Sequence, residues 1–266
     1  MNILYIGDIM GEPGIEVVRR VLPEVVAKHK VELIIAQGEN VTEGKGLSLK
    51  DFKRLEAIGV DFFTGGNWTT HRSELHTYLN DPDRPVIRPA NYPIGTIGKG
   101  YKYFQTLKGP VLIVSLLGQI VGRDADKPVD NPLITIDKIL GDTKHVKSIA
   151  TIVNFHGDFS SEKRVIGYYL DGRATAVIGD HWHVPTADAM VLPNGTAHIT
   201  DVGMCGSLNS SLGVKLETII NRWRDGKVSP NQLETEGPFQ FNAVLIKSDD
   251  QTMLAKSITH IQKIIA

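Results

Sequence analysis

Five short apolar runs in this chain each lead into a residue whose side chain can bind a metal ion. The runs lie at 3–6, 33–36, 62–64, 148–155 and 174–178, and short runs rich in β-branched residues are typical of buried strands. Binding sites in open α/β sheets form beyond the carboxyl ends of the strands, so we expect the side chains at these ends to meet. They supply carboxylate, amide and imidazole donors: Asp8, Glu39, Asn40, Asn67, His156, His181 and His183. The sequence therefore predicts one metal centre at one edge of a sheet.

The last of these strand ends carries two histidines, His181 and His183, with one residue between them. Side chains two apart in extended backbone point to the same side, so the pair can present two imidazoles to one or two ions. A single pair of this kind is a weak signal, and an aspartate or asparagine after a strand is commonly a turn or cap residue. The prediction therefore rests on all five ends together, since unrelated turns need not all carry ligand-type side chains.

The composition is that of an ordinary globular protein, and it argues against several functional classes. The 266 residues are 41% hydrophobic and 22% charged, and the formal net charge of −1 offers no basic surface for duplex nucleic acid or an anionic membrane. No run approaches the roughly 20 apolar residues that span a bilayer. The single cysteine, Cys205, excludes an intrachain disulfide and fits a reducing compartment. Residues 1–8 lack the basic start of a signal peptide, so we expect a cytoplasmic protein, with a homo-oligomer left open.

The first eighty residues alternate between strand patterns and helix patterns. A loop is expected at 7–14, followed by a helix from Ile15 in which Pro23 marks a kink or the end. A second helix is predicted at 48–57 with Ser48 as its N-cap, and a short one at 71–79. Such alternation is typical of βαβ units, and it predicts an α/β fold with residues 1–266 in one domain.

Beyond residue 100 the patterns predict mostly strands. Asp171-Gly172 predicts the turn of a hairpin between two of them, 165–170 and 173–178. The loop-rich stretch at 88–100 is expected to lie over the site rather than to separate two domains. A helix is predicted at 214–224, and the other strands at 101–107, 111–117, 148–155, 197–200, 241–247 and 257–262.

Oxygen and imidazole donors without thiolates suit Mn²⁺, Fe or Zn²⁺ and argue against a structural zinc site. Glu39 could bridge two such ions. Two ions roughly 3.5–4 Å apart would turn a bridging water into hydroxide and hold the attacking and leaving oxygens of a phosphoryl group. The glycines at 7, 11 and 14 lack the spacing of a nucleotide-binding loop, and the serines at 207–211 lack a nucleophile elbow. The residues therefore predict hydrolysis of a phosphoester, with Glu39 as the bridging catalytic ligand.

These motifs, in this order, resemble the calcineurin-like metallophosphoesterases, and among them a small bacterial YmdB-like branch that acts on cyclic nucleotides. The matching segments run from about residue 1 to 224, at 7–11, 38–40, 66–67, 88–93, 155–156, 160–163, 179–184, 186–188 and 200–204. The resemblance implies a four-layer αββα sandwich with two divalent or mixed-valence ions, Fe or Mn before Zn. It places one ion at Asp8, Glu39, Asn40 and His183, and the second at Glu39, Asn67, His156 and His181.

The chain departs from the family pattern directly after Asn67. The family has a histidine there, taken as the general acid that protonates the leaving oxygen, whereas this chain has Trp68, whose indole does not titrate in this range. His71 could supply the proton instead, or the reaction could be slow, since general acid catalysis is worth ~10²–10⁴-fold. Trp68 could also be a platform on which a base stacks, or an ordinary core tryptophan.

A second departure lies beside a proposed ligand. Asn154 stands where the branch usually has aspartate before Phe155-His156, and we expect this change to weaken the orientation of His156.

The sequence thus predicts a dinuclear metal-dependent phosphodiesterase that hydrolyses 2′,3′- or 3′,5′-cyclic nucleotides or similar small phosphodiesters. Two alternatives remain open. One is a regulatory protein that binds metal and nucleotide with weak or no turnover, and the other is a phosphomonoesterase. Neither duplex nucleic acid nor a membrane is expected as a partner.

Overall fold

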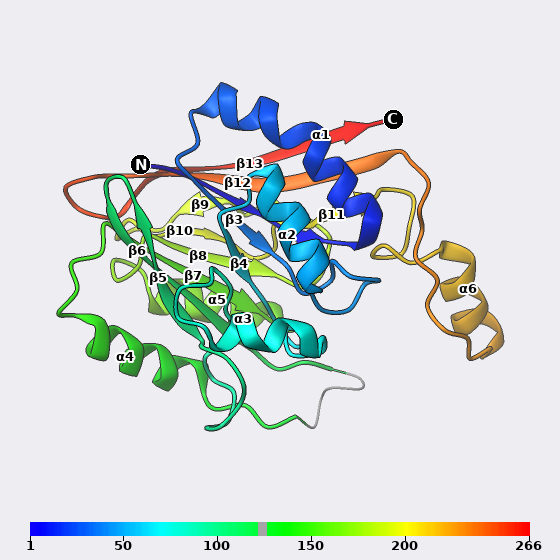
Figure 1. Cartoon of the computed structure of the whole chain (residues 1–266), viewed down its shortest axis with the longest axis horizontal. Helices are drawn as coiled ribbons and strands as arrows, with labels where there is room; N and C mark the ends of the chain where they lie inside the picture. The colour runs from blue at the N-terminus through cyan, green and yellow to red at the C-terminus, as the bar shows by residue number, and fades with distance from the viewer. Residues whose placement is uncertain (122–126) are drawn as a thin grey trace.

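The chain folds into two β-sheets that pack face to face, with helices covering the outer face of each sheet (Figure 1). The computed structural model describes residues 1–121 and 127–266. Within these residues, the larger sheet has seven strands. They are β1 (Asn2–Ile6), β2 (Asp8–Ile9), β3 (Leu33–Gln37), β4 (Phe62–Thr64), β11 (Met204–Ser207), β12 (Phe239–Ser248) and β13 (Ala255–Ile265). Their order is β2-β11-β12-β1-β3-β4, with β13 beside β12.

The second sheet has six strands among the described residues, in the order β5-β6-β7-β8-β10-β9. Strands β6, β7, β8 and β10 run parallel, which brings their carboxyl ends to the same edge. The bounds are β5 (Tyr101–Thr106), β6 (Gly109–Leu117), β7 (Ala150–His156), β8 (Ala176–Asp180), β9 (Met190–Val191) and β10 (Ala197–Ile199).

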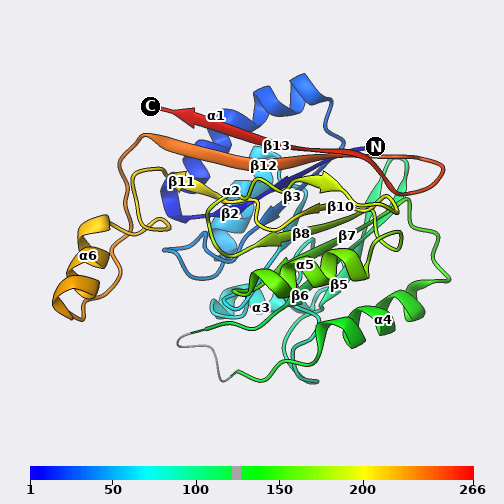
Figure 2. The same ribbon diagram turned by 180° about the vertical axis from the view of Figure 1, so that it is seen from behind.

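Helices cover both outer faces, so the molecule is the four-layer αββα sandwich that the resemblance implied (Figure 2). Helices α1 (Gly11–His29) and α2 (Leu49–Ile58) pack on the seven-stranded sheet. Helices α4 (Pro132–Thr143) and α5 (Ser160–Tyr169) pack on the six-stranded sheet. A 3₁₀ turn η1 (Ser73–Leu75) leads into the short helix α3 (His76–Asn80). No helix of the described chain is both long enough and apolar enough to cross a membrane.

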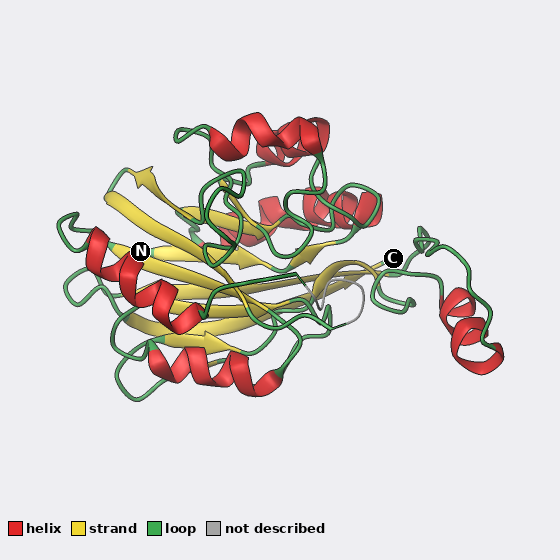
Figure 3. Ribbon diagram, turned by 90° about the horizontal axis from the view of Figure 1, so that it is seen from below, coloured by secondary structure: helices red, strands yellow, loops and turns green. Residues whose placement is uncertain are grey.

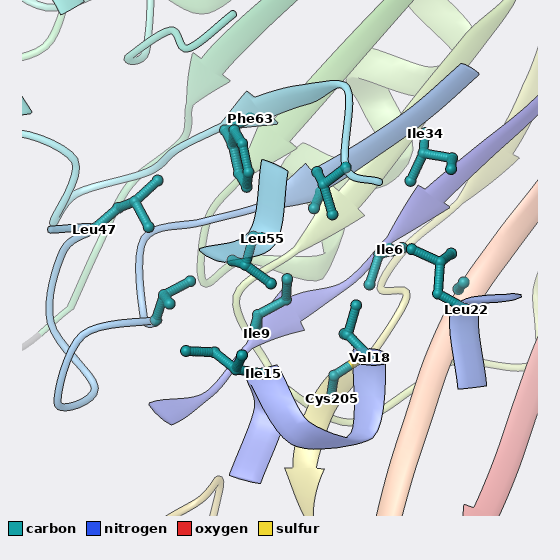
Figure 4. Close-up of a cluster of buried hydrophobic side chains, with 14 of the residues drawn as sticks. Ile6, Ile9, Ile15, Val18, Leu22, Ile34, Leu47, Leu55, Phe63 and Cys205 are labelled. Atoms are coloured by element: carbon teal, nitrogen blue, oxygen red, sulfur yellow. The ribbon is translucent and has the colours of Figure 1, made fainter. Parts of the chain in front are cut away.

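Both faces of the central strands are buried, which explains why their sequences are continuously apolar. In β1, Ile3 and Tyr5 face the core between the two sheets, whereas Leu4 and Ile6 face the core under α1 and α2. Figure 4 shows this second core, in which Ile6 and Phe63 of the sheet meet Val18 of α1 and Leu55 of α2.

Two local predictions for residues 165–178, a strand and a hairpin, are wrong. Residues 165–170 form the end of α5 rather than a strand, so Asp171-Gly172 follows a helix and the predicted hairpin does not form. The exposed Val165, Tyr168 and Tyr169 imitate a strand pattern, whereas Lys163, Ile166 and Leu170 are buried at helical spacing.

Helix α1 begins at Gly11, inside the predicted loop, and continues through the exposed Pro23 to His29. The buried Val21, Leu22 and Val25 on either side of Pro23 keep this helix against the sheet. The sequence patterns also gave no sign of α4 or of the short strands β2, β9 and β11.

Helix α6 (Leu216–Asp225) projects away from the sandwich (Figure 3). It has no buried residue, and Leu216, Ile220 and Trp223 are exposed large hydrophobic side chains on it. The helix therefore adds little to the core that positions the site.

Candidate metal centre

The strand ends singled out in the sequence meet at one edge of the sandwich, where the two sheets approach each other. Tyr5 of β1 reaches across, and its hydroxyl lies 2.7 Å from Thr64 Oγ1 and donates to Asp180 Oδ2 of β8 at 3.0 Å. His156, at the end of β7, lies 2.9 Å through Nε2 from Glu39 Oε1, which follows β3. All seven predicted ligand residues lie in this region, and their role as ligands stays a prediction.

The first group, which we call the His156 half, consists of Glu39, Asn67 and His156. Asn67 Oδ1 lies 3.0 Å from His156 Nε2, on the same side as Glu39 Oε1. The other oxygen of Glu39 accepts a hydrogen bond from the backbone N–H of Trp68 at 3.0 Å. His181 joins this half, since its ligand nitrogen lies within 4.8 Å of the ligand atoms of Glu39 and His156.

Gly66 makes this close approach possible. A Cβ atom added to Gly66 would lie 2.4 Å from the His156 ring and 2.5 Å from Glu39 Oε2. Gly66 is therefore required by packing against the donors, whereas a Cβ atom at Gly65 would lie 2.1 Å from Thr69 Oγ1.

The second group, which we call the Asp8 half, consists of Asp8, Asn40 and His183. His183 Nε2 lies 3.3 Å from Asn40 Oδ1 and 3.7 Å from Asp8 Oδ1. His183 Nδ1 lies 3.1 Å from the backbone carbonyl oxygen of Leu212, which favours a protonated Nδ1 and leaves Nε2 facing the two oxygens. Asp8 Oδ2 accepts from the backbone N–H of His181 at 3.2 Å, so the Asp8 half touches the His156 half.

The donors fit a cation, because buried acceptor atoms face one another without a donor between them. Asp8 Oδ1 and Glu39 Oε1 are both buried and accept no well-aligned hydrogen bond in the described structure, and their nearest ion-pair partners are the imidazoles of His183 and His156. Orphaned buried oxygens of this kind are costly unless an ion or a proton satisfies them. Two oxygens, Glu39 Oε1 and Asn67 Oδ1, also face His156 Nε2, and only a proton or a cation can hold these three atoms together.

The electrostatics of the apoprotein are consistent with this reasoning. Burial raises the pKa of Asp8 well above its usual value, and the nearby Asp180 raises it further. Burial would lower the pKa of His156, but the carboxylates of Glu39 and Asp180 raise it well above the usual value. Burial and the neighbouring His181 lower the pKa of His183 to about 4, so His183 is a neutral imidazole at neutral pH. A bound cation would replace the protons that Asp8 and His156 hold in its absence.

The prediction that His181 and His183 share a side of an extended segment is wrong. Strand β8 ends at Asp180, and the two histidines follow it with positive φ angles of 101° and 62°. Residues other than glycine rarely adopt this backbone region, and it persists only where the surroundings enforce it. The two imidazoles are therefore aimed by a strained loop rather than by strand alternation.

A buried lysine enforces this loop. Lys163 Nζ donates to the Asp180 carbonyl at 2.6 Å and to Asp201 Oδ2 at 2.8 Å, and it lies 4.0 Å from the centre of the Trp182 ring. Asp201 Oδ2 also accepts from the backbone N–H of Trp182 at 2.8 Å. The sequence marked Lys163 only as part of a family-like segment, because a surface helix position carries no sign of full burial.

A carboxylate lies beside His156 although residue 154 is an asparagine. Asp180 Oδ1 lies 2.6 Å from His156 Nδ1 and orients the ring. Asp180 was not among the predicted site residues, although it immediately precedes the histidine pair at the end of β8. Asp158 was missed as well, and its Oδ1 lies 3.2 Å from His181 Nε2.

Trp68 is not a core tryptophan, since it is only half-buried at the edge of the site. Its ring packs edge-to-face against exposed His71, with centroids 5.3 Å apart. The ammonium groups of Lys45 and Lys127 lie 4.8 and 5.6 Å from the ring centre. His71 precedes η1 and α3 rather than lying in a helix. The loop at 88–100 reaches the same place, where the Tyr92 hydroxyl donates to the Gly66 carbonyl at 3.4 Å.

Known proteins share the fold of this chain. A 2′,3′-cyclic-nucleotide 2′-phosphodiesterase of Bacillus subtilis is 38% identical over 261 residues, covering 98% of this chain and 96% of the relative. A crystal structure described as a novel phosphatase from Mycoplasma pneumoniae superposes with a TM-score of 0.91 at 30% identity, covering 99% and 93% of the two chains. A 5′-nucleotidase precursor from Thermus thermophilus shares the fold alone, with a TM-score of 0.58 at 11% identity over 100% of this chain and 54% of the other.

The fold is that of the metallophosphoesterase-type phosphoester hydrolases, and the structure holds a possible metal-binding cluster at Glu39, His156 and His181. Within this class, residues 4–261 match the model of the YmdB-like protein family, and the chain belongs to that family.

Proposed function

We propose that the chain is a metal-dependent phosphodiesterase that hydrolyses 2′,3′-cyclic nucleotides, with 3′,5′-cyclic nucleotides or similar small diesters as the alternative substrates. The convergence of Glu39 Oε1 and Asn67 Oδ1 on His156 Nε2 carries the proposal, because only a proton or a cation can hold these three atoms together and the family pattern puts a cation there. The activity named for the relative from Bacillus subtilis supports the substrate class.

The residues divide into two overlapping donor sets. Asp8, Glu39, Asn40 and His183 would hold one ion, and Glu39, Asn67, His156 and His181 the other, so that Glu39 serves both. Two cations in these places, Fe or Mn by preference and Zn as a third choice, would supply an activated water and neutralise charge on the phosphoryl oxygens. The imidazole and oxygen donors suit these metals.

A cavity beside Asn67 offers room for the nucleoside. It has a volume of about 250 Å³, and its walls include Leu117, Ile120, Val129 and Phe159 together with Lys127. Apolar walls with one aromatic ring and one cation suit a base and its sugar better than a bare phosphate. Trp68 stands next to Lys127 at the rim, so we propose that it contacts the substrate there.

His71 is the proposed source of the proton for the leaving oxygen. Its ring packs on the edge of Trp68, whose backbone N–H is bonded to Glu39, so His71 is an imidazole beside the position where the family has its own histidine. The side chain of His71 is exposed at the edge of the site.

Replacing Glu39 with glutamine tests the proposal. Glu39→Gln preserves the shape but removes the negative charge that both donor sets share, so hydrolysis of 2′,3′-cyclic nucleotides with added Mn²⁺ should fall by orders of magnitude in a folded protein. Glu43→Gln is the matched control, because Glu43 lies in the same loop but is exposed and paired with Arg72. Measurable hydrolysis that is equally fast in the wild type and Glu39→Gln would refute the proposed centre.

The regulatory alternative has one observation in its favour, which is the tryptophan at the position of the family's general acid. Under this alternative, wild-type protein with Mn²⁺ would bind cyclic nucleotides but turn them over no faster than Glu39→Gln. A phosphomonoesterase would instead release phosphate from nucleoside monophosphates and leave cyclic diesters intact.

A further inference from the structure

Asp180 is a fully buried carboxylate that receives hydrogen bonds from four side chains of three other strands. Its Oδ2 accepts from the Tyr5 hydroxyl at 3.0 Å, from Gln37 Nε2 at 3.0 Å and from Asn154 Nδ2, and its Oδ1 lies 2.6 Å from His156 Nδ1. A buried carboxylate is costly unless donors satisfy it, and here strands β1, β3 and β7 all supply them. So many converging donors mark a site built to hold one negative charge.

This charge has a direct consequence for His156. A carboxylate that already accepts from three other donors can only accept from the imidazole as well, so the proton of neutral His156 is placed on Nδ1. Nε2 then carries the lone pair, and Nε2 is the atom that faces Glu39 Oε1 and Asn67 Oδ1. A histidine with the opposite tautomer would point an N–H at the centre of the site.

Asn154 completes the arrangement. It lies two residues before His156 on β7, so both side chains point to the same side of the strand. Its Nδ2 donates to Asp180, and its Oδ1 accepts from Ser115 Oγ at 3.0 Å. An aspartate at 154 would set a second buried carboxylate against Asp180 with no donor between them. Asparagine at 154 and aspartate at 180 therefore fit together as a pair that carries one charge.

We propose that Asp180 is the positioning residue that fixes the tautomer of His156, and that it takes over the task of the carboxylate that the family pattern places at residue 154. The inference rests on the proposed function to the extent that His156 is a ligand. Compared with the family pattern, the negative charge still lies beside His156 but comes from the neighbouring strand β8. Residue 154, an asparagine here, donates a hydrogen bond to this carboxylate.

Exchanging the two residues tests this directly. Asp180→Asn should weaken Mn²⁺ binding at the His156 half by ~10–100-fold, the usual effect of losing the partner of a ligating histidine. Asn154→Asp alone should also weaken it, because two carboxylates then share the space. The double variant Asn154→Asp/Asp180→Asn keeps the charge and the atom count, and it should recover most of the affinity. A double variant that binds Mn²⁺ no better than Asp180→Asn would overturn the inference.

Two further measurements keep the test decisive. Asp61→Asn is the matched control, since Asp61 is a partly buried carboxylate that accepts from the Ile34 backbone, and this variant should leave Mn²⁺ affinity unchanged. Nitrogen-15 spectra of the wild-type protein loaded with Zn²⁺ should show His156 protonated at Nδ1, and this reading does not depend on any variant folding. Protonation at Nε2 would contradict the inference.

The outcomes separate the inference from the proposed function. If wild-type protein binds no ion, the proposed function fails. If it binds ions and depends on Glu39 for hydrolysis, but Asp180→Asn binds Mn²⁺ as the wild type does, only the inference about Asp180 fails.

Discussion

The two halves of the centre differ in how firmly the fold holds them. In the His156 half, the donors approach within 2.9 and 3.0 Å, and side chains of β1, β3 and β7 orient them through Asp180. In the Asp8 half, the corresponding distances are 3.3 and 3.7 Å, and His183 is held by a single backbone carbonyl in a loop. Donors fixed by rigid strands bind with less loss of entropy than donors on a loop. The His156 half should therefore bind its ion first and more tightly.

The difference follows from where each ligand lies in the chain. Glu39 follows β3 and His156 ends β7, two strands inside their sheets, and Asn67 follows β4 at the edge of the larger sheet next to β3. His183 follows a loop with two positive φ angles, and its partner Leu212 also has a positive φ of 54°. The strand ends hold their donors in ordinary backbone conformations. The histidine loop keeps its positive φ angles only because contacts such as that of Lys163 with the Asp180 carbonyl enforce them.

Removing one histidine from each half should give the largest effect. His156→Ala should abolish hydrolysis and tight Mn²⁺ binding. Its Mn²⁺ affinity should fall by more than the ~10–100-fold expected when a ligating histidine loses only its hydrogen-bond partner. His183→Ala should keep the first, tight binding step and lose only the weaker one. Calorimetric titration of Mn²⁺ into both variants distinguishes them. The proposed difference between the halves would be wrong if His183→Ala lost the tight step and His156→Ala kept it.

Loosening the loop should give an intermediate effect on ion binding. Lys163→Met leaves Asp201 without its buried partner, so the free energy of unfolding should fall by about 3–5 kcal/mol, as measured by urea denaturation. The variant that remains folded should bind both Mn²⁺ ions more weakly, and the second step should suffer more, because the first donor set has only His181 in this loop. Lys102→Met is the matched control, because buried Lys102 bonds only backbone carbonyls of Tyr78, Asp81 and Arg84. It should destabilise the fold without changing either binding step.

Restoring a histidine beside the His156 half should change turnover but not ion binding. Trp68→His should raise cyclic-nucleotide hydrolysis by up to ~10²-fold, and it should raise hydrolysis of an activated chromogenic diester less, because a nitrophenolate scarcely needs protonation. Trp68→Phe serves as control for the loss of the indole. His71→Ala should lower cyclic-nucleotide hydrolysis in the wild-type background and have little effect in Trp68→His. Equal changes for both substrates would contradict a role in proton transfer.

Much of the fold could be predicted from the sequence, because the central strands are buried on both faces and therefore read as continuous apolar runs. The ends of β1, β3, β4 and β7 were predicted to meet, and they do. Helix α5 was mistaken for a strand because its exposed face carries Val165, Tyr168 and Tyr169, and no pattern shows which face is covered. The positive φ angles of the histidine loop depend on tertiary contacts, so strand alternation could not reveal them.

The supporting residues of the site were harder to find than the ligands. Asp180 and Lys163 act through contacts with residues far away in the chain, such as Tyr5 and Asp201, and local spacing carries no signal for such partners. Asn154 illustrates the problem, since the sequence showed a missing carboxylate but not the one that Asp180 supplies from the neighbouring strand.

A crystal structure of the protein grown at increasing Mn²⁺ concentrations, with anomalous diffraction data, tests the central claim most directly. We expect two anomalous peaks that share Glu39 as a ligand. The peak beside Asn67 and His156 should appear at the lower concentration, and the peak beside Asp8 and His183 at the higher one. A single peak at saturating Mn²⁺, peaks away from these residues, or filling in the opposite order would contradict a two-ion centre with one pre-organised half.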